Sequence, residues 1–244
     1  MSTLLQKIAT QQAKLENNVL CQHLVHRRDS SAAAYSFLPH MTFFILGFRD
    51  ILEEARIKNP KSDVELALNA HCDEDSGHWL WFIEDLKTLN MDVNYWGGDM
   101  SSILKMLWSP ESYPVRELVY RITNHIRTSK TAEEKMIIVD CMESTFSVFI
   151  NSLNVITHRN GFYNKLKFFG SEHFDAESNH ASGNWLEGEK QHDDDHSHYS
   201  NIQLFRLSHM SFVIDDIFNG FDQVFNYWYN TMQNAMPNDV GIAI

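Results

Sequence analysis

The chain has 244 residues, of which 43% are hydrophobic, and this is enough for one sizeable hydrophobic core. Its 32 acidic and 20 basic side chains give a formal charge of −12, which repels nucleic-acid backbones and anionic lipid headgroups. We therefore expect no nucleic-acid partner and no binding to a membrane surface.

The cysteines and the N-terminal sequence bear on where the protein works. Cys21, Cys72 and Cys141 are odd in number, far apart and outside any CxxC pair, as expected for reduced thiols. The N-terminus lacks a basic segment leading into an apolar one, and the most apolar run, 37–48, is interrupted by Pro39. These features predict a cytoplasmic protein without a signal peptide or a membrane span.

Hydrophobic residues recur with helical spacing along almost the whole chain, and strand-like alternation is rare. This pattern predicts an all-α fold, a single-domain helical bundle over residues 1–244 with about seven helices. We place the helices at residues 2–26, 31–57, 62–89, 111–128, 131–157, 162–182 and 199–236.

Several helix starts and breaks have a recognisable chemistry. Ser62 or Asp63 can cap the helix that begins VELALNAH, and Thr131 with Glu134 has the spacing of a capping box. The segments NYWGGD and WSPESYP are rich in turn-forming residues. We therefore expect turns on both sides of residues 99–109 and place no helix there.

A candidate metal-binding motif lies in the predicted helix 62–89. His71, Asp75 and His78 stand at offsets 0, 4 and 7, so a continuous helix would place all three side chains on one face. Glu74 competes with Asp75 as the carboxylate, but it points about 100° away from this face. We prefer Asp75.

The same spacing recurs about a hundred residues later. His173, Glu177 and His180 again occupy offsets 0, 4 and 7 in the predicted helix 162–182. With thirteen histidines in the chain, one such match can arise by chance, but two matches are improbable. Aromatic residues surround both motifs, which predicts buried surroundings in which imidazole and carboxylate groups need a partner such as a metal ion.

A third helix offers a carboxylate that two ions could share. Glu143 lies in the apolar sequence IIVDCMESTFSVFINSL, at a position that helical spacing turns inward. Imidazole and carboxylate ligands suit iron or manganese, and the lack of clustered thiolates argues against a structural zinc site. The sequence therefore predicts a two-metal site that is bridged by Glu143, with iron as the expected metal and manganese as the alternative.

These residues resemble the haem-oxygenase-like di-iron oxidases and oxygenases, the CADD-like proteins that share a helical fold with TenA and PqqC. His78 matches a metal-binding histidine of the family, Glu143 its middle glutamate, and His173, Glu177 and His180 its last motif. The segments LPHMTFFILGFRDIL and HCDEDSGHWLWFIEDL also resemble the family. The resemblance implies a haem-oxygenase-like bundle with two iron ions per chain and O2 as co-substrate.

The sequence also departs from the family. The first carboxylate of some members would fall at His71 and that of others at Asp75, so the first-helix ligand set stays open. Members that make p-aminobenzoate from their own tyrosine have a lysine where this chain has Leu153, so that reaction is not implied here.

An apolar pocket beside the ions would favour a small-molecule substrate with an apolar part. The aromatic residues expected to line it are Phe43, Phe44, Phe48, Trp79 and Phe82. The last predicted helix is apolar on more than one side and offers a surface for a homodimer through Phe212, Phe218, Phe225 and Trp228.

Two other functions remain open from the residues alone. One is a TenA-like hydrolase or a cofactorless PqqC-like oxidase on the same fold, with Cys141 as a nucleophile. The other is a non-catalytic protein that binds haem through His23 or His26, or that holds metals only for structure.

Overall fold

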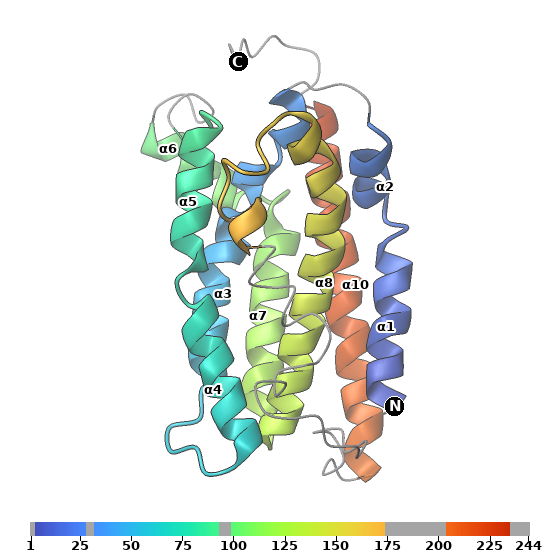
Figure 1. Cartoon of the computed structure of the whole chain (residues 1–244). Coiled ribbons are helices and arrows are strands. Elements are labelled where there is room, and N and C mark those ends of the chain that lie inside the picture. Colours follow the sequence, from blue (N-terminus) through green and yellow to red (C-terminus); the bar gives the residue numbers. More distant parts are fainter. Residues whose placement is uncertain (1–2, 28–31, 93–98, 174–203, 235–244) are drawn as a thin grey trace.

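The computed structural model describes residues 3–27, 32–92, 99–173 and 204–234, and these form a bundle of helices (Figure 1). Short 3-10 helices, η1 (Ala32–Tyr35) and η2 (Leu38–Met41), precede α3. No strand occurs among the described residues, and the predicted all-α class is confirmed. The α-helices of this part of the chain are α1 (Thr3–Leu15), α2 (Val19–His26), α3 (Thr42–Ala55), α4 (Asp63–Asp75), α5 (His78–Thr88), α6 (Met100–Trp108), α7 (Tyr113–Thr128), α8 (Ala132–Arg159) and α10 (Leu204–Asn234).

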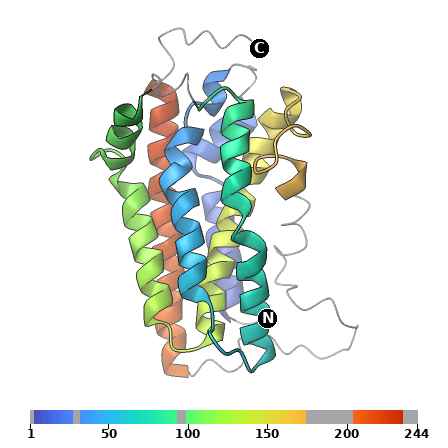
Figure 2. The ribbon, with the colours of Figure 1, turned by 90° about the vertical axis from the view of Figure 1, so that its left-hand side faces the viewer.

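The two longest helices, α8 and α10, pack against each other along the bundle. α1 and α2 contact both of them, α7 packs on α10 and α3, and α4 packs on α3 and α8. Figure 2 shows α4 and α5 following one another beside α3. This arrangement brings α4 against α8, the helix that carries Glu143.

Side-chain caps explain where two of these helices begin. The Ser62 hydroxyl accepts a hydrogen bond from the Glu65 backbone N–H at 3.3 Å, and the Glu65 carboxylate accepts one from the Ser62 N–H at 3.0 Å. The Thr131 hydroxyl accepts from the Glu134 N–H at 3.3 Å. Each cap satisfies a backbone donor that has no partner within the helix, and the predicted caps at Ser62 and Thr131 are confirmed. The capping box predicted at Thr131 is formed only in part, because the Glu134 carboxylate accepts from the Lys130 N–H at 2.8 Å.

α8 ends at a glycine for a conformational reason. Gly161 has a φ of +68°, a left-handed conformation that glycine adopts without a Cβ penalty. The Phe162 N–H reaches back to the Thr157 carbonyl at 2.8 Å and the Gly161 N–H to the His158 carbonyl at 3.1 Å. These bonds close the helix as a Schellman motif and turn the chain back toward the bundle.

The predicted helix 2–26 is two helices, because Asn18 starts a new one. The Asn18 side-chain oxygen accepts from the Leu20 N–H at 2.8 Å, and its amide donates to Asp222 on α10 at 2.8 Å. The competing bonds of one asparagine thus stop α1 and start α2. In the predicted helix 31–57, the α-helix likewise begins only at Thr42, and the 3-10 helices η1 and η2 precede it.

The helix α6 was missed by the sequence analysis. Asp99 caps it by accepting from the Ser102 N–H at 2.8 Å. Its C-terminal end is held by Arg116, which is 7% exposed and donates to the Ser109 carbonyl at 3.1 Å and to the Leu107 carbonyl at 2.5 Å. The Asp99 cap is local to residues 99–109, whereas the support from Arg116 comes from α7 and cannot be recognised in the pattern of those residues.

The core of the bundle combines aliphatic and aromatic side chains, and much of α8 is buried in it. By length and composition α8 could cross a membrane, but 78% of its most apolar window is buried in this protein, as in the core helix of a bundle. On α10, Phe218, Phe225 and Trp228 are buried in the core as well, and Phe212 is exposed. Of the four residues expected to form a homodimer surface, Phe212 is therefore the one that is exposed.

Candidate metal centre

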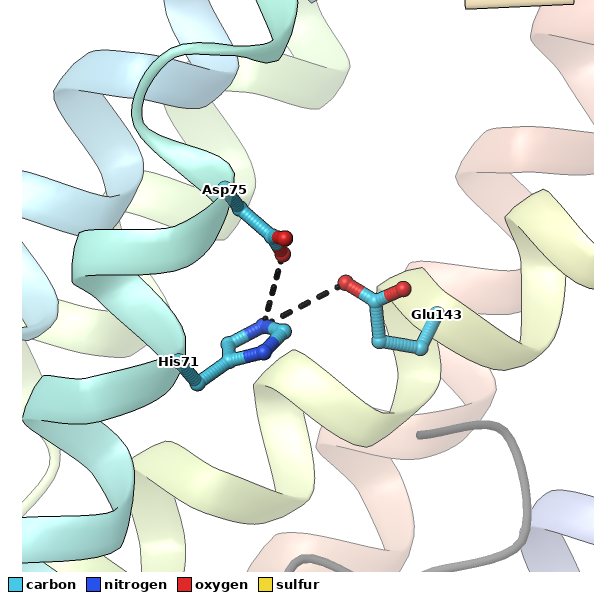
Figure 3. Close-up of side chains that lie close together, drawn as sticks. All are labelled: His71, Asp75 and Glu143. Carbon is cyan, nitrogen blue, oxygen red and sulfur yellow. Dashed lines mark ion pairs between the residues drawn. The ribbon is translucent and has the colours of Figure 1, made fainter. Parts of the chain in front are cut away.

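Three side chains that can bind a metal meet between α4 and α8 (Figure 3). His71 and Asp75 lie in the last part of α4, Glu143 lies near the middle of α8, and all three are buried. His71 Nε2 is 3.0 Å from Asp75 Oδ2 and 3.4 Å from Glu143 Oε1. One donor atom from each residue lies within 4.8 Å of the other two.

These distances fit a single ion. Ligand atoms that lie about 2.1 Å from an ion and at right angles to one another are about 3.0 Å apart. The His71–Asp75 and His71–Glu143 distances are close to this value. One imidazole and two carboxylates are also a donor set suited to iron, manganese or zinc.

The first motif does not lie on one continuous helix, so the predicted helix 62–89 is wrong in this detail. α4 ends at Asp75 and α5 begins at His78, with a turn at Ser76 and Gly77, because the helical hydrogen-bond pattern is interrupted there. His78 nevertheless remains beside the cluster, with its Nδ1 3.4 Å from Asp75 Oδ1. All three residues of the motif are buried.

The carboxylate preferred from the sequence, Asp75, is the one in this cluster. Its side chain is 3% exposed, whereas the side chain of Glu74 is exposed to solvent. The two residues are neighbours in α4, and helical geometry turns their side chains about 100° apart.

The second motif contributes His173 to the same region. Its imidazole ring packs against that of His78, with ring centroids 4.4 Å apart. His173 Nδ1 lies 3.0 Å from the Phe168 carbonyl oxygen. Because a carbonyl only accepts, Nδ1 carries the proton and Nε2 carries the lone pair in the neutral ring. Metal-binding histidines commonly donate the N–H of the ring nitrogen that does not bind the metal to a carbonyl in this way, and this hydrogen bond orients the ring.

Glu177 and His180, the other two predicted ligands of this motif, lie outside the described residues. The helix predicted at 162–182 is wrong over residues 162–170, which form turns and bends, and helix begins only at Ser171. Residues 174–182 of that prediction are outside the described part of the chain.

A buried carboxylate missed by the sequence analysis organises this turn segment. Asp85 on α5 is 1% exposed, and its two oxygens accept from the backbone N–H groups of Lys167 and Phe169, each at 2.8 Å. Burial raises the pKa of Asp85 to about 6, although these backbone hydrogen bonds act to lower it.

Asp85 could have been found from its spacing. It stands seven residues after His78, which is two helical turns, and therefore lies on the same side of α5. The segment that it anchors leads to His173, whose own N–H donates to the Lys167 carbonyl at 3.2 Å. The carboxylate thus supports the position of a candidate ligand without being one.

An apolar cavity adjoins the cluster. Asp75, His78, Glu143 and His173 form the polar lining next to the cluster, and Thr145 and Arg49 are further polar residues of the lining. The cavity has a volume of about 50 Å³. The remaining lining is mostly aromatic and comes from α3, α5, α8, α10 and the 162–170 segment: Phe44, Phe48, Trp79, Phe146, Phe149, Phe168, Phe221, Phe225 and Trp228.

Three of the five aromatic residues expected beside the metals line this cavity, namely Phe44, Phe48 and Trp79. The other two have different neighbours. Phe43 packs against Trp108, with ring centroids 5.8 Å apart, and Phe82 is buried against Phe168 at 5.8 Å. Helical spacing alone does not separate residues that line a cavity from residues that fill the core.

No protein-family model matches this chain, and no curated protein sequence matches it. Its function therefore has to be inferred from the chemistry of the site.

The geometry bears on two of the alternative functions, the one with Cys141 as a nucleophile and the one with His23 or His26 as a haem ligand. Cys141 is fully buried, burial raises its pKa well above the usual value, and it is not among the described residues that line the cavity. A thiol of this kind is a poor nucleophile. His23 and His26 lie on α2, which packs against α8 and α10 away from the cavity lining.

Proposed function

We propose that this protein is a non-haem, di-metal oxidase or oxygenase of haem-oxygenase-like fold that uses O2 on a small organic substrate with an apolar part. The observation that carries the proposal is the buried group of His71, Asp75 and Glu143, with donor atoms within 4.8 Å of one another. The neighbouring pair of His78 and His173 offers donors for a second ion.

Charge supports this proposal. Asp75 and Glu143 are two buried carboxylates, 3% and 6% exposed, and the imidazoles of His71 and His78 lie within 3.4 Å of them. Burying negative charge is costly unless a cation compensates it. With neutral imidazoles, divalent ions provide that compensation, and each imidazole then serves as a ligand.

The residues would divide the work as follows. His71 and Asp75 would hold one ion, His78 and His173 would hold the other, and Glu143 would be shared, since its carboxylate has two oxygens. Glu177 and His180, outside the described residues, are predicted from their spacing to complete the ligand set. Iron, or manganese, would supply the electrons for reaction with O2.

The rest of the cavity would bind the substrate and exclude water. Its aromatic walls offer contact to an apolar molecule and little that holds water. Asp75 and Glu143 line the same cavity as these rings, so a bound substrate would lie directly beside the ions. Exclusion of water strengthens electrostatic interactions at such a site.

Loading with ferrous iron under anaerobic conditions tests the proposal. We expect close to two iron ions per chain, and an absorbance change when the loaded protein is mixed with oxygen. Glu143→Gln keeps the side-chain volume but removes the charge, and we expect at most about one iron per chain and no absorbance change. Glu74→Gln, on the exposed side of α4, is the control and should behave as the parent does.

Two results would overturn the proposal. One is a folded parent protein that binds no iron, which would favour a hydrolase. The other is equal iron content and an equal oxygen response in the parent and Glu143→Gln, which would remove the shared ligand. Circular dichroism of each sample shows whether the helical fold is intact.

A further inference from the structure

Arg49 is the one arginine or lysine in the described lining of the cavity beside the candidate metal centre. Arg49 lies on α3, one residue after Phe48, and its side chain is exposed to solvent. Phe44, Ile45 and Phe48 of the same helix line the apolar part of the cavity. The cavity lining therefore reaches solvent at Arg49.

An aromatic contact holds Arg49 at this position. Its guanidinium carbon lies 5.9 Å from the ring centroid of Trp79, which also lines the cavity. Contacts of this kind attract a cation to the face of the ring and leave the N–H donors at its edge available to a ligand.

The charge of Arg49 is not used in an ion pair within the described part of the chain, in contrast to its neighbours. Arg56, at the end of the same helix, pairs with Asp73 at 2.6 Å and with Glu53 at 3.1 Å. Arg127 pairs with Glu54 at 2.5 Å. In a chain with a formal charge of −12, an arginine left beside a cavity is well suited to attract an anion.

We propose that the substrate is an organic carboxylate with an apolar body, whose carboxylate pairs with Arg49 while its body lies among the aromatic rings. This inference rests on the proposed function, and it names the substrate class of the same site. The guanidinium can bind a carboxylate through two parallel N–H bonds. The end of the molecule opposite the carboxylate then points toward Asp75 and Glu143, the other polar part of the cavity.

A neutral or cationic head group fits this cavity less well. An alcohol accepts a weaker hydrogen bond from the guanidinium than a carboxylate does, and an amine is repelled by it. A molecule with its carboxylate at the metal end would instead lie beside Asp75 and Glu143 and would leave Arg49 unused. Binding measurements separate these orientations.

The test is a titration of the full chain loaded with zinc, which is redox-inert, with linear monocarboxylates of increasing length and with the matching alcohols and amines. Trp79 and Trp228 line the cavity, so tryptophan fluorescence reports occupancy, and calorimetry gives the affinity. We expect one carboxylate length to bind about tenfold more tightly than its alcohol, and the amine to bind most weakly.

Arg49→Gln should weaken carboxylate binding about tenfold, to the level of the alcohol, and leave alcohol binding unchanged. Arg56→Gln is the matched control, because it removes an arginine at the end of the same helix that is already ion-paired. It should leave both affinities as in the parent.

Three results would overturn the inference: alcohol and carboxylate bind equally, Arg49→Gln keeps the carboxylate affinity of the parent, or carboxylate binding requires zinc and not Arg49. Zinc content measured on the same samples separates this failure from failure of the proposed function. Two zinc ions per chain without carboxylate preference would refute only the substrate class. Arg49-dependent carboxylate binding without any metal would refute the metal centre and retain the anion site.

Discussion

His78 and His173 pack against each other, yet two different local structures bring them there. His78 is the first residue of α5, directly after the Ser76–Gly77 turn that follows Asp75. His173 follows a turn segment, 162–170, that is held by hydrogen bonds to Asp85. The two motifs have the same spacing in the sequence, so equal spacing does not imply equal local structure.

The two histidines also differ in how far away in the sequence the residues that position them lie. The position of His78 depends on a turn within two residues of it, whereas the position of His173 depends on a carboxylate more than eighty residues away in the chain. We expect changes to the distant support to affect His173 alone.

The largest effect is expected from removing either histidine. His78→Ala and His173→Ala should each lower the iron content of anaerobically loaded protein from about two ions per chain to about one, because each removes a ligand of the same ion. Both variants should stay helical, since Ala is compatible with a helix. Iron analysis and circular dichroism measure the two properties.

His40→Ala is the control for this pair. His40 is another largely buried histidine, but its Nδ1 lies 2.7 Å from the Tyr227 hydroxyl, and it does not line the cavity. Its removal should leave the iron content unchanged. Equal loss of iron from His40→Ala would mean that loss of any buried histidine disturbs the site.

Asp85→Asn is expected to have the next largest effect. An Asn side chain has one oxygen, so it cannot accept from both the Lys167 and Phe169 N–H groups, and its NH2 group would face one of them. We expect the free energy of unfolding to fall by about 2–4 kcal/mol. Chemical denaturation measures this change.

The same variant should lose iron only from the ion that His173 binds, leaving about one ion per chain. Glu84→Gln is the matched control, because Glu84 pairs with Lys167 of the same segment at 2.9 Å but on the surface. Surface pairs contribute little, so we expect a change within about 0.5 kcal/mol and normal iron content. If both variants behave alike, Asp85 does not position His173.

The sequence predicts the parts of this structure that depend on nearby residues. The caps at Ser62 and Thr131 and the inward position of Glu143 follow from spacing within a few residues. The turn segment before His173 depends instead on Asp85, on a different helix. Local patterns favour a helix through two neighbouring phenylalanines there, and only the tertiary contact shows why the helix starts later.

The candidate site likewise has contacts that the sequence predicts and contacts that depend on which helices pack together. The pairing of Asp75 with His71 follows from a helical spacing of four, and helical spacing also directs Asp75 and not Glu74 inward. The contact of His71 with Glu143 requires α4 to pack on α8, and periodicity does not specify which helices are neighbours. The same holds for Arg49, whose place at the cavity depends on Trp79 of α5.

His40 is expected to make the free energy of unfolding depend on pH. Burial lowers the pKa of His40 from 6.5 to about 4. Between these values the unfolded chain binds a proton that the folded chain does not, so the free energy of unfolding should decrease as the pH falls from 6.5 toward 4. The contribution of His40 is at most about 3 kcal/mol.

His40→Gln isolates this contribution, because glutamine does not titrate and its amide can still form a hydrogen bond with the Tyr227 hydroxyl. The difference in unfolding free energy between parent and variant, measured by denaturation at several pH values, should shrink or reverse as the pH falls from 6.5 to 4. A difference that is constant over this range would show that His40 is not held neutral by the fold.

The smallest effect is expected at Gly77, in the turn that separates Asp75 from His78. Its φ of −96° and ψ of −13° are open to any residue, and an added Cβ meets nothing within 4 Å. Gly77→Ala should therefore raise the free energy of unfolding by about 0.4–1 kcal/mol, by restricting the unfolded chain, and leave the iron content unchanged. Gly161→Ala is the contrasting control, because its φ of +68° should make alanine cost about 1–2 kcal/mol. A loss of stability or iron in Gly77→Ala would mean that the turn needs glycine, and that the support of His78 is less local than its position beside Gly77 indicates.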